Sequence, residues 1–127
     1  MGTEQEQDES AGTMRDVLQR ALWSPPLRDA DELRTMIATV EGYVRRLGPR
    51  LAALAPRMRG ERQATALVVL RHVDDVLSGP TQGSTLADRL HDLSVVARST
   101  LTMLEHPGPL EKPRSTARAR DWSYGIR

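Results

Sequence analysis

Two short stretches of the sequence place a histidine and an aspartate at helical spacing. His72 precedes Asp75 by three residues in RHVDDVL, residues 71–77, and Asp88 precedes His91 by three residues in DRLHDL, residues 88–93. Helical bundles hold metal ions with carboxylates and a carboxylate-x-x-His pair that point inward from facing helices. The same residue types can also form a buried acid/base pair. The direction of these side chains therefore decides which chemistry they can do.

The helical periodicity of both stretches directs these side chains away from the expected core. At about 100° per residue, the apolar stripe of the first helix centres on Val73, so His72 lies at its boundary and Asp75 on the opposite side. On the second helix Asp88 falls nearly opposite the apolar stripe, and His91 lies more than about 120° from it. Burying such charges without partners would be costly. We therefore predict two solvated helix faces, with Asp88 as a helix cap, and we predict no metal site, no catalytic residues and no cofactor.

The composition limits both the fold and the chemistry. The chain of 127 residues has no cysteine, no phenylalanine, and only two tryptophans and two tyrosines. One domain of this length must build its core from aliphatic side chains, and the lack of cysteine excludes disulfides, thiolate metal sites and a cysteine nucleophile. The segment GPTQGST, residues 79–85, lacks the GK[ST] ending of a phosphate-binding loop, and no serine lies in a nucleophile-elbow pattern.

The sequence shows no signal for export or for membrane insertion. The N-terminus, MGTEQEQDESAG, is acidic and polar, unlike a secretory signal peptide. No apolar run approaches the roughly 20 residues that a membrane-spanning helix needs. Together with the lack of cysteine, these features lead us to expect a cytoplasmic protein with no membrane partner.

Apolar residues recur at helical spacing in four segments, whereas no stretch alternates as a half-buried strand would. Turn residues separate the segments, in SPPL at 24–27, RMRGERQ at 57–63 and SGPTQGS at 78–84. The segments that the spacing predicts to be helical are residues 13–23, 30–55, 61–77 and 85–105.

The ends of these helices carry capping signals, and one helix carries a potential break. Two pairs have the spacing of a capping box, namely Thr13 with Asp16 and Thr85 with Asp88. Either Asp29 or Asp31 can cap the start of the second segment. Gly48 and Pro49 should break or kink the second segment. One kinked helix over residues 30–55 and two separate helices both remain open at this point.

These elements predict an all-α fold, a small antiparallel bundle of three main helices plus a short N-terminal helix. Residues 61–77 and 85–105 should form a helical hairpin. The polar ends of the chain differ in charge, the first being acidic and the last basic. We accordingly expect a disordered acidic N-terminus at residues 1–12, a helical bundle domain at 13–106 and a flexible basic tail at 107–127.

Of the 18 basic residues only Lys112 is a lysine, and the arginines gather in two regions. A planar guanidinium makes forked contacts with phosphate and carboxylate groups. The first region contains Arg45, Arg46, Arg50, Arg57, Arg59 and Arg62. The second lies in the tail, where arginines and aromatic residues, the types that dominate protein interfaces, occur together as Arg118, Arg120, Trp122 and Tyr124. Whether this tail docks on the bundle stays open.

Two valines lie off the main apolar stripes of their helices. Val68 belongs to the segment 61–77, and Val95 belongs to the segment 85–105. Either they form a second packing face for the other helices of the bundle, or they belong to a dimer surface.

The central region resembles a known group of proteins. Its segments are ELRTMIATVEGYVRRLGPRLAAL, then ATALVVLRHVDDVLSG, then LADRLHDLSVVARSTLTMLEH, which together cover about residues 32–106. The shared features are an LR-x-x-I helix start, a proline-interrupted second segment, an Ala/Leu-rich helix that ends near glycine, and a final helix with A-x-x-L-x-x-L-x-x-x-A-R. These features resemble an uncharacterised family of short actinobacterial helical proteins that are labelled natural product biosynthesis proteins. The resemblance implies no catalytic residues.

We therefore expect a non-enzymatic helical protein that binds another protein, or a second copy of itself, as an accessory or regulatory factor. The resemblance adds an association with natural product biosynthesis. The alternative is a nucleic-acid-associated regulator that uses the Arg45–Arg62 region and the basic tail, with binding that weakens steeply as salt rises. No recognition-helix signature or zinc finger accompanies those arginines. A small enzyme or ligand-binding bundle would need inward polar groups, and the sequence identifies none.

Overall fold

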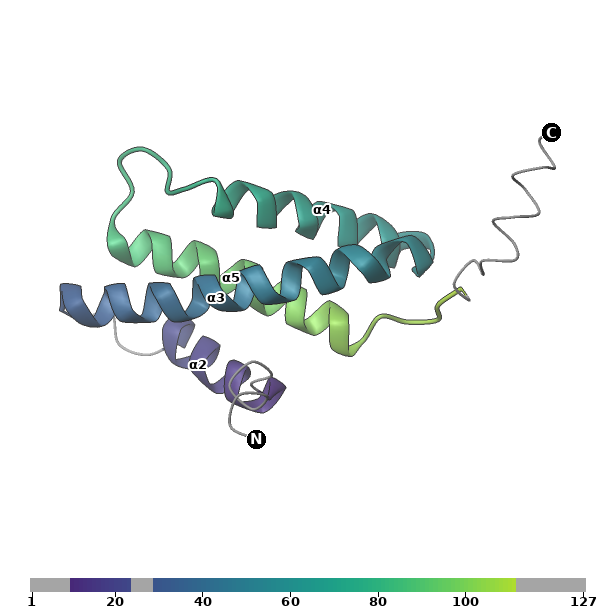
Figure 1. Ribbon diagram of the computed structural model, residues 1–127, viewed down its shortest axis with the longest axis horizontal. Helices are drawn as coiled ribbons and strands as arrows, with labels where there is room; N and C mark the ends of the chain where they lie inside the picture. The colour runs from purple at the N-terminus through teal and green to yellow at the C-terminus, as the bar shows by residue number, and fades with distance from the viewer. Residues whose placement is uncertain (1–9, 24–28, 112–127) are drawn as a thin grey trace.

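The computed structural model describes residues 10–23 and 29–111, which form helices joined by short connections (Figure 1). In chain order the elements are α2 (Ala11–Trp23), α3 (Ala30–Leu54), the 3-10 helix η1 (Ala55–Arg57), α4 (Gly60–Leu77) and α5 (Leu86–Glu105). No strand occurs in the described ranges. The predicted all-α class is confirmed, and three long helices with one short helix match the predicted bundle.

Side-chain caps set where two of the long helices begin. The Glu32 N–H donates to Asp29 Oδ1 over 2.7 Å, which identifies Asp29 rather than Asp31 as the cap of α3. At α5 the Asp88 N–H donates to Thr85 Oγ1, and the Thr85 N–H donates to Asp88 Oδ2. The predicted capping box at the start of α5 is therefore confirmed.

Helix α2 begins earlier than the sequence predicted. The Thr13 N–H donates to Ser10 Oγ over 3.1 Å, and the Met14 N–H donates to the Ser10 carbonyl over 3.0 Å. Ser10 is therefore the cap, and the helix starts at Ala11. The prediction of a cap at Thr13 was wrong because serine one turn earlier is the stronger N-cap residue. The rest of the predicted acidic N-terminus lies outside the described residues.

Helix α3 continues through Gly48 and Pro49, so the two alternatives for this segment resolve to one helix. Gly48 is buried, and a Cβ at this position would lie 3.1 Å from Cγ1 of Val73 on α4. The glycine thus lets α3 and α4 approach closely. Pro49 is exposed, so water can bind the Arg45 carbonyl, which lacks its usual N–H partner one turn later.

The connection between α3 and α4 is shorter than predicted. Helix η1 extends the chain to Arg57, and α4 starts at Gly60, so that most of the predicted loop at 57–63 is helical. Gly60 has a φ of +57°, which lets the chain turn sharply into α4. The Gln63 side chain reaches back and donates to the Ala55 carbonyl over 3.0 Å, which ties the two helices together at this corner.

Helix α5 contacts all the other long elements. It packs most extensively on α3 and also contacts α2 and α4. In Figure 1, α4 and α2 lie on opposite sides of the α3 and α5 pair. Among the described residues α2 contacts α3 and α5 but not α4. The fold therefore leaves one strip of α5, between α2 and α4, without a covering helix.

The buried face of α5 is wider than the predicted apolar stripe. Ser94, Val96, Thr100 and Met103 are buried although they lie outside that stripe, because helices cover α5 on three sides. The Thr100 hydroxyl donates to the Val96 carbonyl over 2.7 Å, whereas Ser94 Oγ has no hydrogen-bond partner among the described residues. The rest of the core is aliphatic except for Tyr43 on α3.

Replacing Pro49 with alanine should stabilise the protein. Alanine restores an N–H donor to the Arg45 carbonyl, and proline is about 3 kcal/mol less favourable than alanine inside a helix. Because Pro49 is exposed and water partly compensates, we expect the free energy of unfolding to rise by about 1–3 kcal/mol in urea titrations followed by circular dichroism. Pro56, at the first turn of η1, is the matched control, since proline is favourable there. An equal gain in Pro56→Ala would contradict this explanation.

Candidate protein-binding groove

The histidines and aspartates of the opening stretches meet at the surface. His72, Asp75, His91 and Asp92 border one shallow cleft of about 280 Å³ between α4 and α5. All four residues are exposed and do not converge in the core, as the helical periodicity predicted. In the described ranges, no three potential metal ligands are placed to share an ion. The carboxylates of Asp75 and Asp92 give this cleft negative charge.

The arginines of the first basic region make different contacts in the structure. On α3, Arg45 lies 2.8 Å from Glu41 Oε2, and the guanidinium carbon of Arg46 lies 5.9 Å from the centre of the Tyr43 ring. Arg50, on the next turn, is exposed. The Glu41 carboxylate offsets the charge of Arg45, so this part of α3 is less basic than its sequence suggests.

Arg57 and Arg62 hold the segment that follows α5. Arg57 Nε donates to the Glu111 carbonyl over 3.0 Å, and the Glu111 N–H donates to the Arg57 carbonyl over 2.8 Å. Arg62 donates to the His106 carbonyl. Gly108 has a φ of +77°, and a Cβ there would lie 2.5 Å from Arg62 Cδ, so no other residue fits without movement. These two arginines therefore serve the fold.

We call residues 106–111 the C-terminal clasp. The sequence assigned residues 107–111 to a flexible tail, but backbone and guanidinium hydrogen bonds tie the clasp to the corner between α3 and α4. Arg59, in the same corner, is exposed and makes no hydrogen bond or ion pair with another described residue. The remaining predicted site residues lie outside the described ranges: Arg118, Arg120, Trp122 and Tyr124.

The uncovered strip of α5 is the floor of an open, mainly apolar groove of about 490 Å³. Helix α2 contributes Leu22 and Trp23 to one wall, and α4 contributes Thr65 and Val69 to the other. We call this feature the α5 groove. Its floor is formed by His91, Val95, Arg98, Ser99, Thr102 and Met103, of which the sequence singled out only His91 and Val95.

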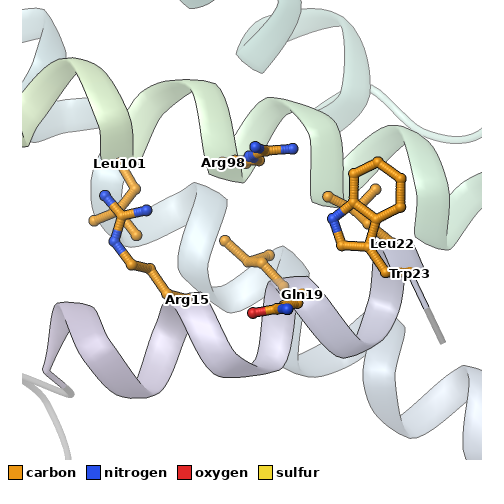
Figure 2. Close-up of a pocket in the computed structure, with 7 residues that line it drawn as sticks. Arg15, Gln19, Leu22, Trp23, Arg98 and Leu101 are labelled. Carbon is orange, nitrogen blue, oxygen red and sulfur yellow. The ribbon is translucent and has the colours of Figure 1, made fainter.

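A second hollow, of about 290 Å³, lies between α2 and α5 and shares Trp23 and Arg98 with the α5 groove. Figure 2 shows Arg15 and Trp23 rising from α2 toward α5, where Arg98 lies between them. Arg15 pairs with Glu105. Arg98 makes no hydrogen bond or ion pair with another described residue. An unpaired guanidinium thus lies beside an exposed indole at the edge of the groove.

Exposed apolar side chains mark the same region. Trp23 is 69% exposed and Val95 is 43% exposed, and both line the groove. Val68, on the helix that forms one wall, is 55% exposed. Apolar groups that gather beside a concave surface indicate an interaction site. The sequence singled out Val68 and Val95, and the structure leaves both uncovered by the bundle. It missed Trp23 because the position of the α2 end relative to α5 depends on tertiary packing.

Comparisons with known proteins found no match. No protein-family model, curated protein or solved structure matches the chain. Within the ranges that the structure describes, no helix has the length and apolar character needed to cross a membrane.

Removing the Arg62 side chain should loosen the C-terminal clasp. We expect Arg62→Ala to lower the free energy of unfolding by about 1 kcal/mol, the usual net value of one such hydrogen bond, and to speed amide hydrogen exchange in residues 106–111. Exchange measured by mass spectrometry on proteolytic fragments would report the change. Arg59→Ala removes an arginine from the same corner without a described contact and should exchange like the wild type. Identical exchange in both variants would show that Arg62 does not hold the clasp.

Proposed function

We propose that this protein is a non-enzymatic binding factor that holds another polypeptide chain in the α5 groove. The observation that carries the proposal is the concave, mainly apolar strip of α5 that neither α2 nor α4 covers. Grooves of this kind receive a helix, which lays its apolar face along the floor. Trp23 and Arg98 at the edge are residue types that often dominate the free energy of protein association.

The polar groups of the groove favour binding over catalysis. His91 and Ser99 are the residues of the floor that come nearest to a base and a nucleophile. They are eight residues apart on α5, which separates them by roughly 12 Å along the helix at about 1.5 Å per residue. A serine nucleophile and its base must lie within hydrogen-bond distance, so this pair does not form a catalytic unit.

An accessory or regulatory role in natural product biosynthesis stays a prediction that the sequence resemblance alone carries. The nucleic-acid alternative has less support than protein binding. Arg57 and Arg62 donate to backbone carbonyls of the C-terminal clasp, and Arg45 pairs with Glu41. These guanidinium groups would have to leave their present partners, or share them, to bind phosphate.

Site-specific photo-crosslinking in the native cell tests the proposal. A photoreactive amino acid at position 95 should capture a defined protein, which mass spectrometry then identifies. The matched control is position 67, because Leu67 is also an exposed aliphatic residue, 57% exposed, but does not line the groove. Equal adducts at both positions, or no protein adduct of any kind at position 95, would overturn the proposal.

The captured protein, once purified, should lose affinity when the groove floor is charged. Val95→Arg places a guanidinium at the apolar centre of the floor and should weaken binding at least about tenfold in calorimetric titrations, which corresponds to about 1.4 kcal/mol. Leu67→Arg should leave the affinity unchanged. Both positions are exposed, so neither variant should change the free energy of unfolding by more than about 0.5 kcal/mol. A parallel loss of affinity in Leu67→Arg would place the interface elsewhere.

A further inference from the structure

The two flanks of the α5 groove differ in charge. On the α2 flank, the charged residues that line the adjoining hollow are Arg15 and Arg98, and Arg98 also lines the groove (Figure 2). Arg15 pairs with Glu105, whereas Arg98 makes no hydrogen bond or ion pair with another described residue. On the α4 flank, Asp75 and Asp92 border the neighbouring cleft. The groove therefore has an uncompensated positive charge on one flank and negative charge on the other.

We propose that the occupant of the α5 groove is an amphipathic helix of a partner protein, which places an acidic side chain against Arg98. This inference rests on the proposed function, because it requires the groove to be a protein interface. Every lining residue belongs to α2, α4 or α5, so the groove offers no free backbone edge to an extended chain. A helix satisfies its own backbone hydrogen bonds, and it would cover the side of α5 that the bundle leaves open.

The dimensions of the floor set the length and the spacing of the partner segment. From His91 to Met103 the floor extends about 18 Å along α5, so a partner helix of about 12 residues spans it. Arg98 lies one turn after Val95, about 4.5 Å further along the axis. Residues three or four apart share one helix face. The acidic residue should therefore lie three or four positions from the apolar residue that covers Val95.

The α4 flank sets a second condition on the partner. The acidic cleft shares His91 and Val95 with the groove, so an acidic residue on that side would approach Asp75 and Asp92. Like charges brought together at an interface weaken association. A helix with its acid toward α2 and an uncharged or basic residue toward α4 matches both flanks. Residues 112–127 of this chain match less well, because they carry five basic residues and the single acid Asp121.

Selection of peptides on the purified full chain tests this inference before the partner is known. The probe is a phage-displayed library of random peptides, each long enough to form several helical turns. The wild type should enrich peptides with apolar residues at helical spacing and an aspartate or glutamate three or four positions from one of them. Arg98→Glu should enrich arginine or lysine at that place instead. Arg59→Glu, the matched control, makes the same charge change at an exposed arginine away from the groove and should select like the wild type.

A synthetic peptide from the wild-type selection gives the affinity. In calorimetric titrations at low salt, Arg98→Glu should weaken its binding about fivefold or more, and replacing the acidic residue of the peptide with arginine should restore binding to this variant. Circular dichroism confirms that each variant is folded. A selection that enriches no peptide, selected peptides without the acid, or an equal loss of affinity in Arg59→Glu would contradict the inference. A photo-crosslink in the purified chain from position 95 to residues 112–127, or to a second copy, would contradict it too, because the groove would already have an occupant.

The protein that position 95 captures in the cell separates this inference from the proposed function. If such a protein is captured and Arg98→Glu leaves its affinity unchanged, the proposed function stands while this inference fails. If position 95 captures no protein, both fail. A captured segment that carries the acidic residue at the expected spacing, and that binds Arg98→Glu only after its acid is replaced by arginine, supports both.

Discussion

The burial of α5 on three sides is the constraint on which the rest of the structure depends. Helices α2, α3 and α4 all contact α5, and its buried set extends beyond the aliphatic stripe to Ser94 and Thr100. Thr100 satisfies its hydroxyl within the helix, but Ser94 Oγ is buried without a partner in the part of the chain that the structure describes. An unsatisfied buried hydroxyl costs about 1–3 kcal/mol. The packing of three helices against α5 therefore outweighs a local polar cost.

The same arrangement creates the α5 groove. Helix α2 has 13 residues and α5 has 20, and α2 packs beside α5 without reaching α4. Three helices pack around α5, but α2 and α4 do not contact each other. The side of α5 between α2 and α4 therefore stays uncovered. Trp23, at the end of α2, borders this strip and stays exposed because no element of the described chain lies over it.

Residue patterns within each helix predicted most of the fold. The remaining features depend on contacts between residues that are far apart in the sequence. Asp29 and the Thr85–Asp88 capping box act through hydrogen bonds to nearby backbone, so their residue types sufficed. Gly48 and Pro49 suggested a break in the helix when only their residue types were considered. The structural reason for a glycine inside a continuous α3 is the close approach of Val73, which belongs to another helix and is not visible in the local sequence. Arg62 was read as a binding residue for the same reason, since its acceptor at His106 is 44 positions away.

The candidate site combines both kinds of signal. Periodicity showed that His91 and Val95 lie off the main apolar stripe of α5, but only the packing of α2 and α4 shows that they share the floor of one groove with Arg98. That floor is apolar around Val95, and Trp23 and Arg98 border it. Because an exposed ion pair contributes little affinity, the apolar contact at Val95 and Trp23 would supply most of the binding free energy of a partner, and Arg98 would favour a partner with an acidic group at that edge.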